Sequence, residues 1–310
     1  MATRFELVLV GDSPGIRAAG EQALEEILRV ERMLSLYQPS SEVAGLNVRA
    51  GAGRVPVSAE LFDLLQRAVA LSAETDGAFD VTIAPLVRCW GFMKGTGATP
   101  SDNEIQEARA NVGFGFLELN PSDRTVRFAR AGMMLDFGAF GKGYAIDRAV
   151  EVLRDAGVRA ALLHGGASTV FGLGTQADGQ PWKVTIEGAP SGESAPTLAI
   201  VELREEALSV SAVWGKSFAS QGRTFGHILD ARTGMPSERA ELAAVVAPSA
   251  AESDALSTAL LVDGAPALDR IAAKRADARL LVMSGKDIRQ SSIVNKAVLQ
   301  SGASNSLSIV

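Results

Sequence analysis

The stretch Leu135–Asp147, which reads LDFGAFGKGYAID, decides the fold class. Its apolar run breaks into glycines and then continues at helical spacing through Ala149, Val150 and Leu153. This order predicts a strand, a glycine-rich turn and a helix. Such a turn exposes backbone N–H groups beside a helix N-terminus, which together form a phosphate site. The lysine is followed by Gly143 rather than Ser or Thr, and the spaced dinucleotide fingerprint is absent, so neither a Walker loop nor an ordinary Rossmann oxidoreductase is indicated.

Helices and strands alternate on both sides of this stretch. Apolar residues at helical spacing predict further helices at Glu21–Leu34, Ser58–Glu74, Ser101–Ala110 and Pro266–Lys274. Short apolar runs between turn residues predict strands at Phe5–Val10, Gly115–Leu119, Thr125–Phe128, Met133–Asp136, Ala160–Leu163, Trp182–Glu187, Thr197–Leu203, Ala207–Val213, Glu241–Val246 and Arg279–Met283. No linker divides the chain, so we expect an α+β fold, with mixed sheets and flanking helices, in one domain over residues 1–290. Residues 291–310 are small and polar, which predicts a loosely ordered tail.

The composition is that of a compact protein with a large core. The 310 residues are 47% hydrophobic and 21% charged. No apolar run approaches the roughly 20 residues of a membrane span. The net charge of −6 disfavours a nucleic-acid partner, because phosphate backbones require a basic surface. The single cysteine, Cys89, excludes an internal disulfide and is expected to be a packed thiol.

The segment Asp254–Thr258, which reads DALST, carries the next candidate site. On a helix, Asp254, Ser257 and Thr258 fall at i, i+3 and i+4, so one carboxylate and two hydroxyls project from one face. Oxygen ligands of this kind suit a hard cation such as Mg²⁺, which keeps part of its shell for water and phosphates. The alternative is a small-residue helix packed closely on a sheet, with its hydroxyls bonded to the i−4 carbonyl.

The chain has only two histidines, His164 and His227. His227 lies in the segment Gly226–Gly234, and an imidazole that titrates near neutrality is a natural acceptor for the proton of an attacking hydroxyl. A structural role, in which the ring bonds Asp230 or a backbone carbonyl to shape the turn, stays open. Asp230 and Arg232 are expected to form a buried pair that fixes this loop. His164 is interpreted as a strand-end side chain near the pocket.

Short motifs follow one another through nearly the whole chain. They are Met1–Phe5, Leu36–Glu42, Leu46-Asn47, Asp76–Thr82 (DGAFDVT), Pro85–Val87, Trp90–Phe92, Gly165-Gly166, Gly226–Gly234 and Asp254–Thr258. Their types and order resemble those of the ApbE-type flavin transferases, the FAD:protein FMN transferases. The resemblance implies an ApbE-like (T-fold-like) fold, which is two-lobed and forms a single catalytic unit.

The resemblance also implies a reaction and its partners. A Thr or Ser hydroxyl of an acceptor protein attacks the phosphorus of FAD nearest riboflavin, so that FMN becomes joined through a phosphoester and AMP is released. Bound Mg²⁺ would neutralise charge on the two phosphates. The implied metal ligands are Asp254, Ser257, Thr258 and the carbonyl of Ala139. The implied catalytic residues are His227 and Asp254.

The implied FAD contacts are Met1, Tyr37, Ala78, Phe79, Asp80, Asp136, Lys142 and Ile228. Aromatic and apolar groups supply stacking area for a large planar ring, and Asp136 offers acceptors for the adenine amine or a ribose hydroxyl. Phe79 is alternatively a core residue. Asp80 is alternatively a cap for nearby backbone, beside a tight turn at Gly77.

The chain departs from the family pattern at two positions. Trp214 stands where many members of the family carry small residues, so it narrows acceptor access or stacks on flavin, and Ala231 replaces a proline.

Two other functions remain alternatives: an FAD pyrophosphate hydrolase, with water as nucleophile, and a catalytically idle FAD-binding protein. Met1 falls on the family's opening methionine and no basic-then-apolar leader follows it, so we expect a natural start and a cytoplasmic protein.

Overall fold

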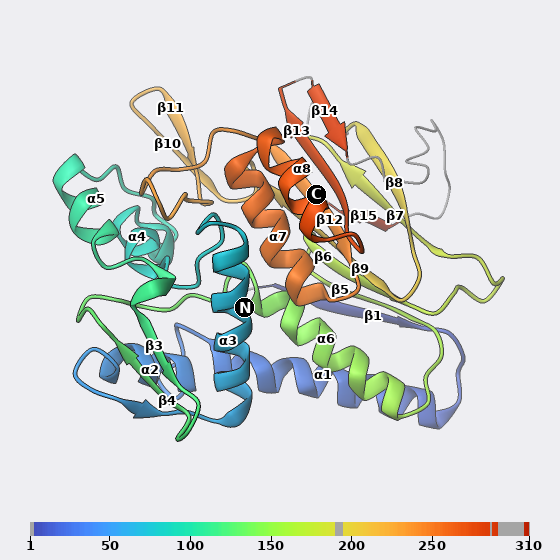
Figure 1. The fold of residues 1–310 in the computed structure, drawn as a ribbon. Coiled ribbons are helices and arrows are strands. Elements are labelled where there is room, and N and C mark those ends of the chain that lie inside the picture. Colours follow the sequence, from blue (N-terminus) through green and yellow to red (C-terminus); the bar gives the residue numbers. More distant parts are fainter. Residues whose placement is uncertain (1–2, 190–194, 286, 291–306, 310) are drawn as a thin grey trace. The chain divides into compact units, whose positions relative to one another are not determined.

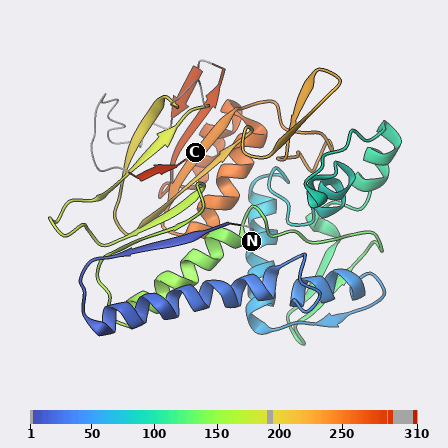
Figure 2. The ribbon, with the colours of Figure 1, turned by 180° about the vertical axis from the view of Figure 1, so that it is seen from behind.

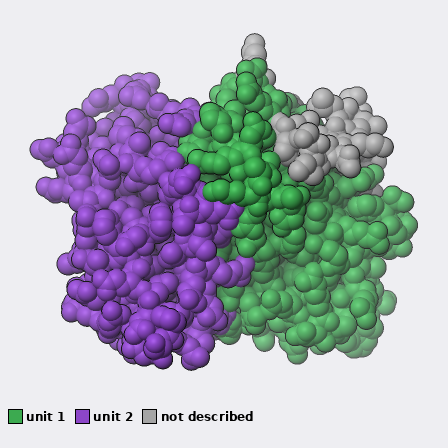
Figure 3. Space-filling model, in the orientation of Figure 1, with its two compact units in different colours: residues 1–30, 140–212, 240–310 green, residues 31–139, 213–239 purple. Residues whose placement is uncertain are grey.

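A computed structural model describes residues 3–189, 195–285, 287–290 and 307–309. The chain forms two compact units, coloured separately in Figure 3. Unit 1 comprises residues 1–30, 140–212 and 240–310, and unit 2 comprises residues 31–139 and 213–239. Each unit contains both helices and strands, which confirms the α+β class. No described helix combines the length and the apolar character needed to cross a membrane.

Unit 1 is built on a seven-stranded sheet, visible in Figures 1 and 2. Its strands, in spatial order, are β1 (Phe5–Leu9), β5 (Ala161–Gly165), β6 (Thr169–Leu173), β9 (Glu206–Ala212), β12 (Leu242–Ala247), β13 (Arg279–Ser284) and β14 (Asp287–Gln290). Each neighbouring pair is antiparallel. β6 and β12 are buried along their whole length and consist mainly of small and apolar residues, as expected of strands without a solvent-exposed face.

Three helices cover one face of this sheet (Figure 1). They are α6 (Gly141–Asp155), α7 (Ala250–Asp263) and α8 (Ala265–Lys274). α7 packs on β9 and β12 and also against α6 and α8, which explains why nearly all of its residues are buried and why it is rich in Ala and Leu. Unit 1 also holds most of α1 (Pro14–Leu34).

A second, three-stranded sheet in unit 1 has the order β15 (Leu307–Ile309), β7 (Trp182–Glu187), β8 (Thr197–Leu203). It packs on β6, where a Cβ at Gly172 would meet Leu203 and Trp182 within about 3 Å. The indole N–H of Trp182 donates to the carbonyl of Leu173 at 3.0 Å, so a polar atom of this buried ring is satisfied.

Unit 2 is mainly helical. Its helices are α2 (Glu42–Arg49), α3 (Ala59–Glu74), α4 (Ala84–Cys89) and α5 (Asp102–Arg109), with short 3₁₀ turns at Phe92–Lys94 and Phe114–Phe116. Its strands form the sheet β2 (Val55–Pro56), β4 (Thr125–Phe128), β3 (Leu117–Asn120) and the hairpin β10 (Ser217–Ser220), β11 (Arg223–Gly226). Serine caps begin α2, α3 and α5, and α5 starts with a complete capping box of Ser101 and Glu104.

Most predicted elements are confirmed, several with the predicted bounds. The predicted strand Met133–Asp136 is wrong, because only an isolated bridge pairs Met134 with Ile83. The Asn47 amide explains the difference: it donates to the carbonyl of Leu135 at 3.1 Å and accepts from the Leu135 N–H at 2.8 Å. A side chain thus takes both groups that a neighbouring strand would use.

Other differences are smaller. The strand predicted from Gly115 begins at Leu117, because Phe114–Phe116 forms a 3₁₀ turn. α1 begins earlier than predicted, at Pro14. Sequence periodicity missed α2, α4, β2, β6, the hairpin β10–β11, β14 and β15, which are short. Cys89 is a partly buried free thiol against the apolar cluster of unit 2. The described part of the predicted loose tail is ordered instead, because Leu307–Ile309 forms β15 and pairs with β7; the rest of the tail lies outside the described residues.

Candidate active site

The close packing of α6 on α7 organises the site in unit 1. A Cβ at Gly143 would lie 2.1 Å from the carbonyl oxygen of Ala250, so only glycine permits this helix spacing. One turn later on α6, Asp147 caps the N-terminus of α7. Its carboxylate accepts from the N–H groups of Ala250 at 2.7 Å and Ala251 at 3.1 Å, and from the Ser249 hydroxyl at 2.7 Å.

This packing brings Lys142 to Asp254. The Lys142 ammonium lies 3.2 Å from each carboxylate oxygen, and the Gly143 N–H donates to one of them at 3.3 Å. The Asp254 residue is only 4% exposed, whereas the Lys142 side chain is 20% exposed. The N-cap residue of α6, Phe140, makes no side-chain capping bond. A lysine ammonium therefore stands beside a helix N-terminus, an arrangement that favours anionic ligands.

The hydroxyls of Ser257 and Thr258 bond back to the helix. They donate to the Asp254 carbonyl at 3.0 and 3.2 Å; the Thr258 bond is the i−4 contact that the packed-helix alternative predicts, and the Ser257 bond reaches back three residues. The hydroxyl of Ser211 on β9 lies 2.9 Å from that of Ser257 and 3.4 Å from that of Thr258. Ser257 is fully buried, whereas Thr258 is partly exposed.

The cluster offers a cation such as Mg²⁺ one carboxylate, from Asp254, and neutral oxygens. Within the described ranges, no group of three or more Asp, Glu, His and Cys side chains converges. One carboxylate with neutral oxygens still fits Mg²⁺ when substrate phosphates supply further ligands, which is a usual arrangement for this ion. Asp254 and Thr258 fit that set best, because the Ser257 hydroxyl is enclosed by its bonds to Ser211 and to the Asp254 carbonyl.

In unit 2, the segment Asp76–Thr82 forms a turn held by Asp80. One carboxylate oxygen accepts from the N–H and hydroxyl of Thr82 at 2.8 and 2.7 Å, and the other accepts from the Phe114 N–H at 2.8 Å. Burial raises the pKa of the Asp80 carboxyl above its usual value, although these hydrogen bonds act in the opposite direction. Ala78 and Phe79 are buried, as the core alternative for Phe79 predicts.

Tyr37 and Asp136 form a second feature of unit 2. The Tyr37 residue is 68% exposed, which is unusual for a large ring. Partial burial and the nearby Asp136 carboxylate both raise the pKa of its phenol. The Asp136 N–H donates to the carbonyl of Val81 at 2.8 Å, so Asp136 is tied by backbone to the Asp80 segment. An exposed ring beside a carboxylate suits a planar ligand with hydrogen-bond donors.

His227 follows the hairpin β10–β11. Its Nδ1 lies 3.0 Å from the carbonyl of Lys216, and because a carbonyl only accepts, Nδ1 carries the proton. The lone pair of the neutral ring is then on Nε2. The ring of Phe92 meets the imidazole edge-on, at 6.4 Å between centroids. The backbone of Ile228 is fixed in the same loop, where its carbonyl accepts from Ser237 N–H at 2.9 Å.

Asp230 and Arg232 form the expected pair in this loop. The guanidinium of Arg232 donates to both carboxylate oxygens of Asp230 at 2.8 and 2.9 Å. Burial acts to raise the pKa of Asp230, but the hydrogen bonds and charge of Arg232 outweigh it and lower the pKa below its usual value. The loop around His227 is therefore held by this pair and also by the bond from the imidazole Nδ1 to the Lys216 carbonyl, which is the backbone contact of the structural alternative for His227.

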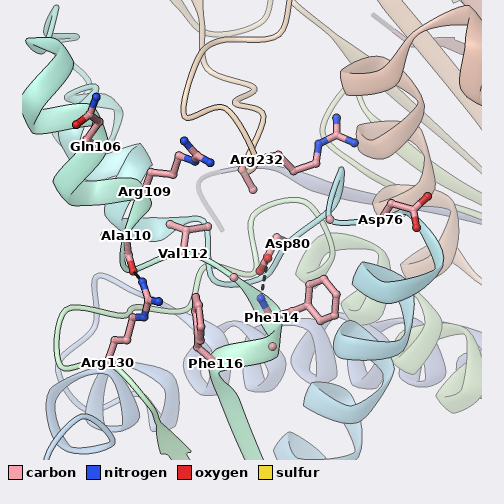
Figure 4. Close-up of a pocket in the computed structure, with 14 residues that line it drawn as sticks. Asp76, Asp80, Gln106, Arg109, Ala110, Val112, Phe114, Phe116, Arg130 and Arg232 are labelled. Atoms are coloured by element: carbon pink, nitrogen blue, oxygen red, sulfur yellow. Dashed lines mark hydrogen bonds between the residues drawn. The ribbon is translucent and has the colours of Figure 1, made fainter.

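A cavity of about 720 Å³ lies beside the Asp80 turn, and Figure 4 shows the side chains around it. Arg109 from α5 and Arg232 from its loop reach it from different elements, and the phenyl rings of Phe114 and Phe116 line another part. The guanidinium of Arg130 lies 3.8 Å from the Phe116 ring centroid. Aromatic faces and guanidinium groups together suit a planar or anionic ligand.

Comparisons with known proteins agree on one family. The family model described as the ApbE family matches residues 1–282. The chain belongs to the ApbE family. Proteins called FAD:protein FMN transferase from Klebsiella pneumoniae and Salmonella typhimurium are 28% and 29% identical to it, over 85% and 81% of this chain and 77% and 73% of their own lengths.

Solved structures of ApbE proteins share the fold. The ApbE protein of Thermotoga maritima aligns with a TM-score of 0.83 at 27% identity, covering 94% of this chain and 93% of its own. The flavinyl transferase ApbE of Pseudomonas stutzeri aligns with a TM-score of 0.78 at 28% identity, covering 93% of this chain and 94% of its own. The family and fold expected from the motif order are thereby confirmed.

The residues predicted for the ApbE site divide between the units. Unit 1 contains Lys142, Asp254, Ser257 and Thr258, and brings them together. Unit 2 contains Tyr37, Ala78, Phe79, Asp80, Asp136, Ala139, His227 and Ile228. Met1 lies outside the described residues. His164 is on β5, where Nε2 lies 3.1 Å from Glu6 and Nδ1 3.3 Å from the carbonyl of Gly166.

Sequence reasoning missed several residues that shape this ApbE site. Ser211 was noted only as part of a departure from the family pattern, yet its hydroxyl meets the Asp254 cluster. Asp147 and Asn47 hold the segments that carry Asp254 and Asp136. Trp214 was singled out from the sequence, but the burial of its indole N–H, without a partner in the described part of the chain, was not foreseen. Asp147 follows Gly143 by one helical turn on α6, but its bonds to α7 and the other contacts are visible only after folding.

Proposed function

We propose that this ApbE-family chain transfers FMN from FAD to a Thr or Ser hydroxyl of an acceptor protein, with Mg²⁺-dependent release of AMP. The relatives called FAD:protein FMN transferase support the substrate and the kind of acceptor. The observation that carries the proposal is the Lys142–Asp254 pair at the N-terminus of α6. Pyrophosphate cleavage requires charge to be neutralised on two adjacent phosphates, and this pair supplies a cation and a metal-binding carboxylate side by side.

In the proposed reaction, the acceptor hydroxyl oxygen forms a bond to the phosphorus nearest riboflavin. The bond from this phosphorus to the bridging oxygen breaks, and AMP leaves with that oxygen. The hydroxyl proton passes to Nε2 of His227, whose Nδ1–H stays on the Lys216 carbonyl. Lys142 and the first N–H groups of α6 bind phosphate oxygens.

The residues that the family resemblance implies fall into two groups, metal ligands and FAD contacts. Asp254, Ser257, Thr258 and the Ala139 carbonyl would hold Mg²⁺, which when bound polarises phosphoryl oxygens and stabilises the leaving group. Met1, Tyr37, Ala78, Phe79, Asp80, Asp136, Lys142 and Ile228 would contact FAD. The exposed Tyr37 ring offers stacking area and Asp136 offers acceptors.

We also propose how the chain is organised and where it acts. Residues 1–290 would act as one catalytic unit, followed by the small polar tail of residues 291–310. The reaction would take place in the cytoplasm.

Incubation of the protein with FAD and Mg²⁺, with and without an acceptor domain that carries a Thr or Ser site, tests the function. The expected result is AMP in equal amount to FMN bound to the acceptor, and little AMP without acceptor. AMP with free FMN in both reactions would indicate the hydrolase. Intact FAD in both would indicate an idle binding protein. A reaction that proceeds unchanged in excess EDTA would contradict the Mg²⁺ dependence.

A further inference from the structure

The contacts of Asp254 show which of its partners can exchange. Its carboxylate is buried and receives three contacts, two from the Lys142 ammonium and one from the Gly143 N–H. All three are 3.2 to 3.3 Å long, at the weak end for charged hydrogen bonds. Lys142 is the neighbour that can leave, because a lysine ammonium sits on a flexible four-carbon stem.

The backbone around this pair has little freedom to move. Gly143 contacts Ala250 without room for a methyl group, and the Asp147 carboxylate joins α6 to the first amides of α7. The Cα atoms of Lys142 and Asp254 are therefore kept at one spacing. Rotation of the partly exposed Lys142 side chain is the motion that can separate the two charges.

Charge balance explains why they should separate. One carboxylate cannot neutralise both an ammonium and a divalent cation, so the two compete for Asp254. A released ammonium is a poor neighbour for a bound Mg²⁺ unless an anion lies nearby. The pyrophosphate of FAD is such an anion, and the N-terminus of α6, on which Lys142 lies, favours it.

We infer that Lys142 is an exchangeable counter-ion: it neutralises Asp254 in the free protein and moves to the pyrophosphate of FAD when Mg²⁺ binds the carboxylate. This inference rests on the proposed function. Its consequence is cooperative binding, in which Mg²⁺ releases the lysine that FAD uses. By linkage, FAD strengthens Mg²⁺ binding by the same factor.

Calorimetric titration of the purified protein and of Lys142→Met, without acceptor protein, tests the exchange. Mg²⁺ alone should bind the variant roughly tenfold more tightly, because the competing ammonium is removed. FAD alone should bind both proteins with similar affinity, since Lys142 is engaged with Asp254 before Mg²⁺ arrives. FAD in the presence of Mg²⁺ should bind the variant more weakly than the wild type, by roughly fivefold or more.

Two controls separate the role of Lys142 from general effects of charge and folding. Lys183→Met removes the same charge from an exposed position on β7 and should leave all three affinities unchanged. Lys142→Arg keeps the charge on a side chain that also pairs with carboxylate, and should restore most of the coupling between Mg²⁺ and FAD. Thermal melting of each variant shows whether it is folded.

The outcomes distinguish this inference from the proposed function. If Lys142→Met weakens FAD binding equally with and without Mg²⁺, the lysine is a permanent phosphate ligand and the exchange is wrong, although the function stands. If Mg²⁺ alone binds wild type and variant with equal affinity, Lys142 and Mg²⁺ do not compete for Asp254, and the exchange is again wrong. If the wild type binds neither FAD nor Mg²⁺, the proposed function and the exchange fail together.

Discussion

Two buried aspartates, Asp80 in unit 2 and Asp254 in unit 1, are held in opposite ways. Asp80 is 7% exposed and accepts three hydrogen bonds of 2.7 to 2.8 Å from fixed groups of Thr82 and Phe114. Asp254 is 4% exposed and has longer contacts, mainly from one flexible side chain. Burial alone therefore does not separate a structural carboxylate from one available to a ligand; the mobility of its partners does.

The largest expected effect is the loss of Asp254. Asp254→Ala removes the only carboxylate of the proposed Mg²⁺ site, so Mg²⁺-dependent AMP release should fall by about 10³-fold or more, the scale of several kcal/mol of charge stabilisation. The fold should survive, because Lys142 can turn its ammonium to water. The measurement is AMP formation over a range of Mg²⁺ concentrations, together with a thermal melt. Normal turnover at limiting Mg²⁺ would rule out this aspartate as the metal ligand.

His227 is held in place through Nδ1, which donates to the Lys216 carbonyl, and its Nε2 is proposed to accept the proton of the acceptor hydroxyl. His227→Ala should lower the transfer rate by about 10²- to 10⁴-fold, the usual contribution of a general base, and leave FAD affinity nearly unchanged. Single-turnover transfer and FAD titration by flavin fluorescence measure the two effects. A loss confined to FAD affinity would reassign the imidazole to shaping the loop. Phe92→Leu, which alters only the ring beside it, is a matched control.

Asp80 should affect stability more than chemistry. Asp80→Ala leaves buried N–H groups of Thr82 and Phe114 without an acceptor, so the free energy of unfolding should fall by about 2 kcal/mol. Asp80→Asn keeps the shape of the side chain and one acceptor oxygen, so its free energy of unfolding should fall less than that of Asp80→Ala. Urea unfolding of the three proteins gives the comparison. An unchanged urea midpoint for Asp80→Ala would show that the three hydrogen bonds to Asp80 contribute little to the stability of the fold.

The smallest effect concerns pH and the Asp230–Arg232 pair. Because the pKa of Asp230 is lowered in the folded protein, its contribution is fully present above the ordinary value of 3.8 and is lost as pH falls below it. With Arg232 partly exposed, this contribution should be about 1 kcal/mol or less. Asp80 acts with the opposite sign: its raised pKa means that stability falls as pH rises from 3.8 through the folded pKa.

Urea unfolding between pH 3 and pH 5 (about one unit either side of the ordinary carboxyl pKa) measures both slopes. Asp230→Asn should flatten the loss of stability at low pH, and Asp80→Asn should steepen it. Parallel curves for wild type and both variants would show that neither carboxylate is linked to folding.

The sequence predicted those parts of the fold whose signals are local. Trp182–Glu187 and Thr197–Leu203 have the predicted bounds because alternation and turn residues mark both ends. Ser58 marks the start of α3 because its hydroxyl caps the helix. The strand expected at Met133–Asp136 failed because a side chain distant in sequence, Asn47, pairs with its backbone. Local patterns do not contain that information.

The candidate site shows the same limit. Spacing on α7 predicted that Asp254, Ser257 and Thr258 share a face, and the back-bonded hydroxyls match the structural alternative stated from the same spacing. The pairing of Lys142 with Asp254 was not predicted, because it depends on how α6 packs on α7. The Trp214 indole N–H, buried without a described partner, was likewise beyond the reach of residue patterns.

The contact between Gly143 and Ala250 has a consequence for how this protein can vary. Position 143 is helical, so its glycine has no conformational requirement that would exclude alanine; the exclusion is purely steric, by a carbonyl oxygen 2.1 Å from where a methyl carbon would be. Alanine is otherwise the best helix former, and it would favour α6 as an isolated helix by up to about 1 kcal/mol. A substitution that improves the helix must therefore separate it from α7. A design that replaced Gly143 with alanine to improve helix propensity would stabilise α6 alone and disrupt the packing on α7 that brings Lys142 to Asp254.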